Sequence, residues 1–132
     1  MIHVIIPTTP DRRELALRCA RSVEENSNYP HTTTLFENDY IGWPKAVLKA
    51  IEGIHDNEFV VLMESDVVAE PNWLAVLAQA FFAKFPYGNG CAEPYNEFHN
   101  GNLIQHPLCK ASLLRETIYP LYFHNFADNE MS

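Results

Sequence analysis

The sequence predicts an α/β domain built on a mainly parallel sheet. Short apolar runs rich in β-branched residues alternate with stretches of helical periodicity over residues 1–85. Such alternation indicates parallel strands joined by right-handed helical crossovers, with helices on both faces of the sheet. The 132 residues suit one domain spanning residues 1–132, because domains of this size form a single core. We therefore expect a three-layer α/β/α arrangement.

The first strand is expected at Met1–Ile6, where Pro7 interrupts an apolar run. Asp11 follows in a turn and is expected to cap a helix over residues 12–25. After a loop, the β-branched segment Thr32–Phe36 predicts the second strand.

The second helix is expected to open at Gly42 and Pro44, because proline is favourable in a first helical turn. Its apolar period continues to Ile54. The third strand is expected at Glu58–Met63, a continuous apolar run of the kind found in buried parallel strands. A long apolar helix over residues 71–85 follows.

The pattern changes after Pro86. Residues 88–94 and 100–105 each predict a short strand, and the second is a candidate antiparallel addition to the sheet. Residues 108–116 predict a short helix, and an aromatic tail follows from Ile118. The expected fold is therefore a mainly parallel sheet with an antiparallel strand near the C-terminus.

Charge and composition argue against several classes of function. Nine Lys and Arg against 17 Asp and Glu give a net charge of −8, which disfavours a nucleic-acid or anionic-membrane surface because phosphates require basic patches. No apolar stretch approaches the ~20 residues that span a bilayer, and the first residues do not resemble a signal peptide. Cys19, Cys91 and Cys109 lack metal-ligand spacing, so we expect reduced thiols in a cytoplasmic protein.

Polar residues follow each of the three predicted strands. Ligands of open α/β sheets bind at the carboxyl ends of the strands, so these residues are expected to converge on one edge. They are Thr8, Thr9, Asp11 and Arg12 after the first strand, Glu37 and Asp39 after the second, and Glu64 and Asp66 after the third.

The carboxylates of Glu64 and Asp66 are the strongest candidates for metal binding. Strand residues two apart face the same way, so these like charges would repel unless a cation lay between them. Mg²⁺ or Mn²⁺ is expected, because both ions combine carboxylate, water and phosphate oxygens. Arg12 and Lys45 are candidate partners for the phosphate groups.

Plainer interpretations remain open for all of these residues. The acids after the third strand could simply precede a helix. The motifs GxGxxG and GxxxxGK[ST] are absent, which disfavours ordinary dinucleotide and P-loop sites. The remaining candidates could be loop residues, solvated side chains or turn hydroxyls: Glu37, Asp39, Arg12, Lys45, Thr8 and Thr9.

The order of these motifs resembles family 2 glycosyltransferases of the GT-A fold. The resemblance is carried by HVIIPTTPDR, TTLFEND, GWPKAVLKAIEGI and FVVLMESDVVAEPNWL, which cover nearly all of residues 2–85. Members of this family have a second strand that ends in an acid, and an apolar strand that ends in D-x-D before a P-x-W-L helix. The resemblance implies a Rossmann-like GT-A domain that is an unusually short member of the family.

The resemblance also implies which residues bind the nucleotide sugar. Asp39, or Glu37, matches the acid that contacts the nucleotide base, and Thr8 lies beside the same nucleotide. Glu64 and Asp66 match the D-x-D pair, with Asp66 at the position that normally binds the metal directly. Thr9, Arg12 and Lys45 complete the expected nucleotide-sugar site.

The tail FHNFADNEMS resembles, more loosely, the later acidic motif of the family. Asp128 and Glu130 match the position of the catalytic base in inverting members, and His124 is a further candidate metal ligand. The implied reaction transfers a sugar from a UDP- or GDP-sugar to an acceptor hydroxyl, with inversion. Mn²⁺ or Mg²⁺ would stabilise the departing diphosphate, and a carboxylate would take the acceptor proton.

Two other functions remain open from the sequence. One is a catalytically reduced module that binds a nucleotide sugar. The other is a nucleotidyltransferase, which is less favoured because PTTPDRR lacks the glycines of a triphosphate-binding loop. The density of aromatic residues over 119–126 also allows a homodimer interface.

Overall fold

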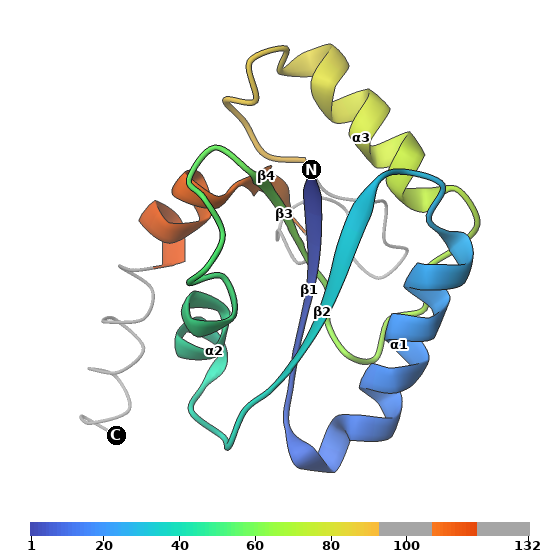
Figure 1. Ribbon diagram of the computed structural model, residues 1–132, viewed down its shortest axis with the longest axis vertical. Helices are drawn as coiled ribbons and strands as arrows, with labels where there is room; N and C mark the ends of the chain where they lie inside the picture. The colour runs from blue at the N-terminus through green and yellow to red at the C-terminus, as the bar shows by residue number, and fades with distance from the viewer. Residues whose placement is uncertain (93–106, 119–132) are drawn as a thin grey trace.

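The computed structural model describes residues 1–92 and 107–118 and contains a four-stranded mixed sheet with the order β2-β1-β3-β4 (Figure 1). β1, β2 and β3 are parallel, and β4 is antiparallel to β3. The predicted α/β class is therefore confirmed, and the antiparallel strand lies at Leu108–Lys110 rather than at the predicted residues 100–105. The elements are β1 (Ile2–Thr8), the 3₁₀ turn η1 (Pro10–Arg12), α1 (Arg13–Asn26), β2 (His31–Glu37), α2 (Trp43–Ala50), β3 (Phe59–Leu62), α3 (Trp73–Lys84), β4 (Leu108–Lys110) and a helix at residues 111–118.

Helices lie against both faces of the sheet (Figure 1). In β1, Val4 and Ile6 pack in one cluster with α1 and α3, whereas Ile5 packs in a second cluster with α2 and the helix at 111–118. This division follows from the strand period of two, which sends successive side chains to opposite faces. All three side chains are at most 1% exposed, so β1 is buried from both sides.

β1 runs two residues further than predicted and includes Pro7. The carbonyl of Ile5 accepts a hydrogen bond from Met63 N at 2.9 Å, so Ile5 and Pro7 direct their backbone groups toward β3. β3 has ended at Leu62, level with Ile5. The missing N–H of Pro7 therefore costs no hydrogen bond within the sheet, which is where proline is tolerated in a strand.

The predicted helix cap at Asp11 is wrong. α1 begins at Arg13 after the η1 turn, and no side-chain hydrogen bond caps it. Asp11 instead accepts hydrogen bonds from Thr9 Oγ1 at 2.5 Å and from Tyr40 Oη at 3.1 Å. The short turn after β1 thus directs this carboxylate toward the loop that follows β2.

The other helices begin or end within a few residues of the predictions. α2 begins at Trp43 and has Pro44 in its first turn, as expected, but ends at Ala50. A turn closed by Ile54 N and Ile51 O at 2.9 Å follows it. α3 begins at Trp73, after Asn72 in a left-handed conformation with a φ of 63°.

The largest correction concerns residues 108–116, which were predicted as a helix. Leu108–Lys110 forms β4, and only residues 111–118 are helical. The strand predicted at 88–94 is reduced, within the described residues, to a single bridge between Ala92 and Leu108. The strand predicted at 100–105 lies outside the described residues. Within the described ranges, no helix is both long enough and apolar enough to cross a bilayer.

Candidate functional site

The carboxyl ends of β1 and β2 lie at the bottom of Figure 1, and the parallel β3 points the same way and ends level with Ile5 of β1. β1 leads into α1 on one face, and β2 leads into α2 on the other. Because the neighbouring strands β1 and β2 connect to helices on opposite faces, this edge of the sheet is a topological switch point, the position at which open α/β sheets bind ligands. The residues predicted from the three strand ends, Thr8 to Arg12, Glu37, Asp39, Glu64 and Asp66, lie in the segments at this edge.

Asn38, in the loop after β2, is hydrogen-bonded to the end of β1. Its backbone N and its Nδ2 both donate to the carbonyl oxygen of Thr8, at 2.9 and 2.7 Å. Its Oδ1 accepts from Ile41 N at 3.1 Å. Thr8 is buried and its hydroxyl donates to Thr9 O at 3.4 Å, so the Thr8 side chain serves the local turn. The hydrogen bonds of Asn38 set the separation between the ends of β1 and β2.

Glu64 and Asp66 lie in a turn rather than on a strand. β3 ends at Leu62, and Val67 N donates to Glu64 O at 3.2 Å, which closes a four-residue turn. The alternation that was expected to place both carboxylates on one face therefore does not apply, because it requires extended backbone. Both side chains are nevertheless exposed, and Ser65 between them is buried.

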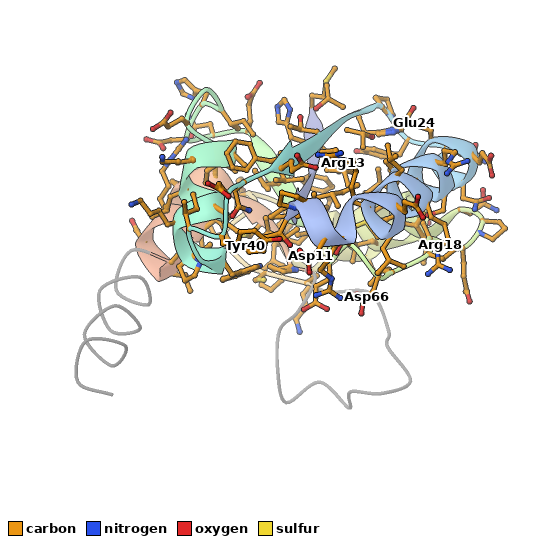
Figure 2. The ribbon with its side chains drawn as sticks, turned by 90° about the horizontal axis from the view of Figure 1, so that it is seen from below. Asp11, Arg13, Arg18, Glu24, Tyr40 and Asp66 are labelled. Atoms are coloured by element: carbon orange, nitrogen blue, oxygen red, sulfur yellow. The ribbon has the colours of Figure 1, made fainter. Side chains whose placement is uncertain are left out.

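Arg12 approaches the carboxylate of Asp66, with Nη2 3.7 Å from Oδ2. Both side chains are half exposed. The contact joins the turn after β1 to the turn after β3, and Figure 2 shows Asp66 beside this end of α1. Asp66 also lies close to the buried Cys19, whose pKa is raised to about 11 mainly by burial and secondly by the Asp66 charge.

Arg13, labelled in Figure 2, forms a second ion pair at the same edge, with Glu37. Nε and Nη2 of the guanidinium donate to the two carboxylate oxygens, at 2.7 and 2.8 Å. The pKa of Glu37 is lowered by these hydrogen bonds and by the Arg13 charge. Arg13 was missed by the sequence prediction, although it directly follows Arg12 after the first strand.

Tyr40 is the other residue of this edge that sequence reasoning missed. Its side chain is 62% exposed, its backbone has a φ of 58°, and its hydroxyl donates to Asp11. Partial desolvation of the hydroxyl and this hydrogen bond raise the pKa of the Tyr40 phenol. The pKa of Asp11 is lowered, mainly by the hydrogen bond from Thr9. The only signal in the sequence was an aromatic residue directly after the second strand-end acids.

The remaining predicted residues divide into two groups. Asp39 is exposed in the loop after β2, and Lys45 is exposed in the first turn of α2. Asp128, Glu130 and His124 lie outside the described residues. Among residues 1–92 and 107–118, no three His, Cys, Asp or Glu side chains are grouped as a metal cluster.

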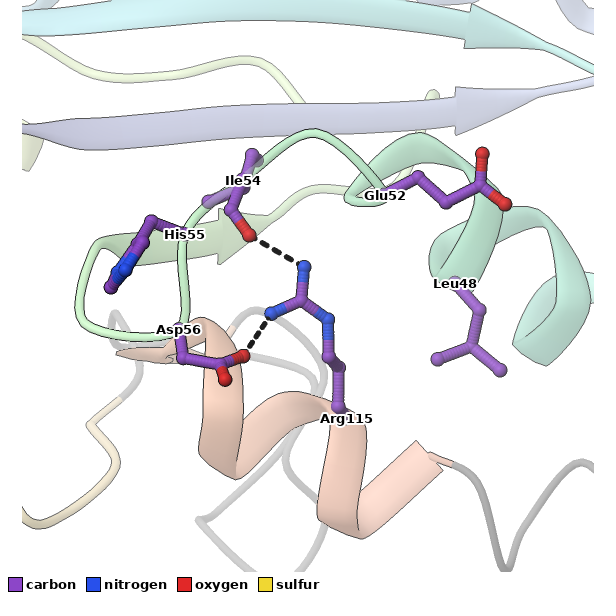
Figure 3. A pocket seen from close by; sticks show the side chains of 6 residues that line it. All are labelled: Leu48, Glu52, Ile54, His55, Asp56 and Arg115. Carbon is purple, nitrogen blue, oxygen red and sulfur yellow. Dashed lines mark hydrogen bonds and ion pairs between the residues drawn. The ribbon is translucent and has the colours of Figure 1, made fainter.

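A pocket of about 480 Å³ lies away from this edge, between the end of α2 and the helix at 111–118 (Figure 3). Arg115 stands at its centre. Its Nη2 donates to Ile51 O at 2.7 Å and to Ile54 O at 2.6 Å, and its Nη1 pairs with Asp56. These bonds hold the turn after α2 against the helix at 111–118, so Arg115 has a structural role.

The carboxyl edge therefore presents exposed carboxylates and two arginines on three adjacent loops. Carboxylate oxygens bind hard cations, and guanidinium groups bind phosphate or carboxylate. Comparisons of this chain with protein-family models, curated proteins and solved structures found no match.

Proposed function

We propose that the protein is a metal-dependent glycosyltransferase that uses a UDP- or GDP-sugar and inverts the transferred sugar. The observation that carries this proposal is the approach of Arg12 to Asp66 across the ends of β1 and β3. This contact supports the proposal because a guanidinium can bind phosphate and a carboxylate can bind a cation, and a metal-bound diphosphate needs both groups close together. The finer fold assignment, a three-layer Rossmann-like GT-A domain, belongs to the same proposal.

The exposed turn after β3 fits Mn²⁺ or Mg²⁺ in the chemistry of its donors. These ions are held by one or two carboxylates and keep several waters and substrate phosphates as further ligands. Asp66 is the proposed direct ligand, and Glu64 is the second acid of the turn. When bound, the metal would stabilise the charge on the departing diphosphate.

The nucleotide is proposed to lie between the ends of β1 and β2, where Asn38 holds the two loops at a fixed separation. Asp39 is the exposed acid there. Arg12 would leave the carboxylate of Asp66 for a phosphate oxygen once a metal neutralises that carboxylate. Asp128 or Glu130 is proposed to accept the proton of the acceptor hydroxyl.

A thermal-shift panel tests donor binding. UDP, GDP and their sugar conjugates are added with and without MnCl₂, and the unfolding temperature is measured. A ligand present at one hundred times its Kd stabilises the native state by about 2.7 kcal/mol. We expect stabilisation by one nucleotide class, and we expect it to be larger with Mn²⁺. If no nucleotide shifts the transition in the presence of Mn²⁺, the site proposal fails.

Two variants with the same charge change make the test specific. Asp66→Asn should abolish the Mn²⁺-dependent part of the shift. Glu25→Gln, on an exposed residue near the far end of α1, should leave it intact. Release of free nucleoside diphosphate from the sugar nucleotide then distinguishes an enzyme from the alternative, a module that binds the donor without turnover.

A further inference from the structure

β4 is paired on both of its sides. On one side it is antiparallel to β3, and on the other Leu108 forms an antiparallel bridge with Ala92. Ala92 N donates to Leu108 O at 3.1 Å, and Leu108 N donates to Ala92 O at 2.6 Å. These reciprocal bonds identify Ala92 and Leu108 as a hydrogen-bonded pair in an antiparallel ladder.

The next pair in this register is Cys91 opposite Cys109. Directly opposed residues alternate along an antiparallel ladder, so this pair is of the non-hydrogen-bonded type, with Cα atoms about 4.5 Å apart. Disulfides need Cα atoms roughly 4.4–6.8 Å apart. A pair at this ladder position therefore suits a cross-strand disulfide.

The packing of the two side chains agrees with this register. Ala92 and Leu108 pack in the cluster with α1 and α3, whereas Cys91 and Cys109 pack in the cluster on the opposite face. The two thiols are hydrogen-bonded to each other, and both are reduced. Cys109 is buried and Cys91 is partly exposed, so a reagent in solvent can reach the pair through Cys91.

The turn before Cys91 packs closely against Phe85. Gly88 has a φ of 73°, and its N donates to Phe85 O at 2.9 Å. At Gly90, a Cβ atom would lie 2.3 Å from the Phe85 ring, so a side chain there would have to displace this ring. The Ala92–Leu108 bridge then brings Cys91 beside β4.

We infer that Cys91 and Cys109 are an oxidisable dithiol that closes to a disulfide on reaction with a low-molecular-weight disulfide such as oxidised glutathione. The sequence gives no CxxC signal for this pair, because the two residues come together only through strand pairing. The inference is independent of the glycosyltransferase proposal, since it involves neither the carboxyl edge nor a nucleotide.

The chemistry balances as two thiol–disulfide exchanges. The Cys91 thiolate attacks one sulfur of the oxidant, forms a mixed disulfide and expels one thiolate. The Cys109 sulfur then loses its proton to that thiolate and attacks the Cys91 sulfur, which expels a second thiolate. The second thiolate takes up the proton that Cys91 released on ionisation. The protein loses two hydrogens and two electrons, and the oxidant gains them as two thiols.

The order of attack follows from the environments of the two thiols. The hydrogen bond with Cys91, together with burial, raises the pKa of Cys109. Cys109 is buried and Cys91 is partly exposed, so an oxidant in solvent reaches the Cys91 sulfur first. Cys109 therefore keeps its proton while Cys91 reacts, and it acts as the resolving thiol.

Thiol mapping of the full chain tests the inference. The protein is incubated with oxidised glutathione, denatured and alkylated with iodoacetamide. We expect two of the three thiols to escape alkylation, with a mass loss of about 2 Da for the two hydrogens removed. A peptide linking Cys91 to Cys109 should appear, and dithiothreitol should abolish it. Alkylation of all three thiols, or a bridge involving Cys19, would overturn the inference.

Single variants test the pair and the order of attack. Cys19→Ser should leave the bridge unchanged, because Cys19 packs on the opposite face of the sheet. Cys109→Ser should accumulate a glutathione adduct on Cys91, and Cys91→Ser should leave Cys109 fully alkylatable after denaturation. A glutathione adduct on Cys109 in the Cys91→Ser variant would contradict the assigned order. Disulfide-linked dimers as the only product of the unmodified chain would contradict the internal bridge.

Discussion

Arg13 donates two parallel hydrogen bonds to the carboxylate of Glu37, at 2.7 and 2.8 Å. The pair joins the first turn of α1 to the last residue of β2. A two-pronged contact of this kind fixes the geometry of both groups. Glu37 is therefore committed to Arg13, and Asp39 is the acid after β2 that remains available to a ligand.

The Arg13–Glu37 pair distinguishes Glu37 from Asp39, the two acids that the sequence left open as partners of the nucleotide base. We expect Asp39→Asn to weaken nucleotide diphosphate binding about 10- to 150-fold, because a hydrogen bond to a charged group is worth about 1.5–3 kcal/mol. Glu37→Gln should change the affinity less than about twofold. Isothermal titration with Mn²⁺ present measures both. A larger loss in Glu37→Gln than in Asp39→Asn would reverse the assignment.

The same ion pair predicts a pH dependence of stability. Arg13 holds the pKa of Glu37 below its usual range, so the folded state binds the Glu37 proton more weakly than the unfolded state does. The stabilisation is therefore present above the unfolded glutamate pKa of about 4.3 and is lost as the pH falls through the folded value.

Arg13→Ala should remove this pH-dependent stabilisation. The pKa of Glu37 in the variant should rise toward its ordinary value, which NMR titration of the carboxyl group measures. In urea unfolding, the variant should be less stable than the unmodified protein near neutral pH, and the difference should shrink in acid. A difference that grows as the pH falls would contradict the assigned sign.

Because Arg12 is paired with Asp66, we expect the Arg12→Gln substitution to have opposite effects on metal binding and on nucleotide binding. Without nucleotide, the guanidinium competes with a cation for Asp66, so Arg12→Gln should tighten Mn²⁺ binding about two- to fivefold, as expected for an exposed pair. With nucleotide, loss of the phosphate partner should weaken diphosphate binding. Mn²⁺ electron paramagnetic resonance and isothermal titration measure the two effects. Arg18→Gln, an exposed arginine further along α1, is the control.

The order of strands and helices could be predicted because apolar period and strand burial are local properties of the sequence. β4 was missed for a specific reason. Leu108, Ala111, Leu114 and Ile118 are all buried, and their spacing of three or four residues also fits one face of a helix. Only pairing with β3 decides that Leu108 belongs to a strand, and this contact is remote in sequence.

The candidate site was predictable as a location but not in its contacts. Strand ends place Arg12, Glu37 and Asp66 at one edge whatever their partners are. The partners depend on loop conformation. The turn at 64–67 replaces the expected strand alternation, and the η1 turn determines that Arg13, rather than Arg12, reaches Glu37.

Gly42 predicts a stability loss that involves no steric clash. Its φ of 92° and ψ of 149° precede α2, and a Cβ atom there would meet no neighbour within 4 Å. Gly42→Ala should cost about 1–3 kcal/mol, because only glycine adopts this conformation without strain. Gly53 is the matched control, since a Cβ there also meets nothing within 4 Å and the residue does not have positive φ. Equal urea midpoints for the two alanine variants would contradict the strain argument.

We expect substitution of Arg115 to destabilise the protein, even when the new residue is lysine. The Arg115 guanidinium donates to the carbonyl oxygens of Ile51 and Ile54 and pairs with Asp56; Figure 3 shows the contacts with Ile54 and Asp56. Its side chain is 27% exposed, so Arg115→Ala should lower the unfolding free energy by about 2 kcal/mol. Arg115→Lys should restore less than half of this loss, because a single ammonium cannot reproduce the planar arrangement of donors. Glu116→Ala, on the exposed neighbouring residue, is the control in the same urea titration. An Arg115→Lys variant as stable as the unmodified chain would contradict this prediction. It would mean that the positive charge, rather than the planar arrangement of donors, holds the turn after α2 to the helix at 111–118.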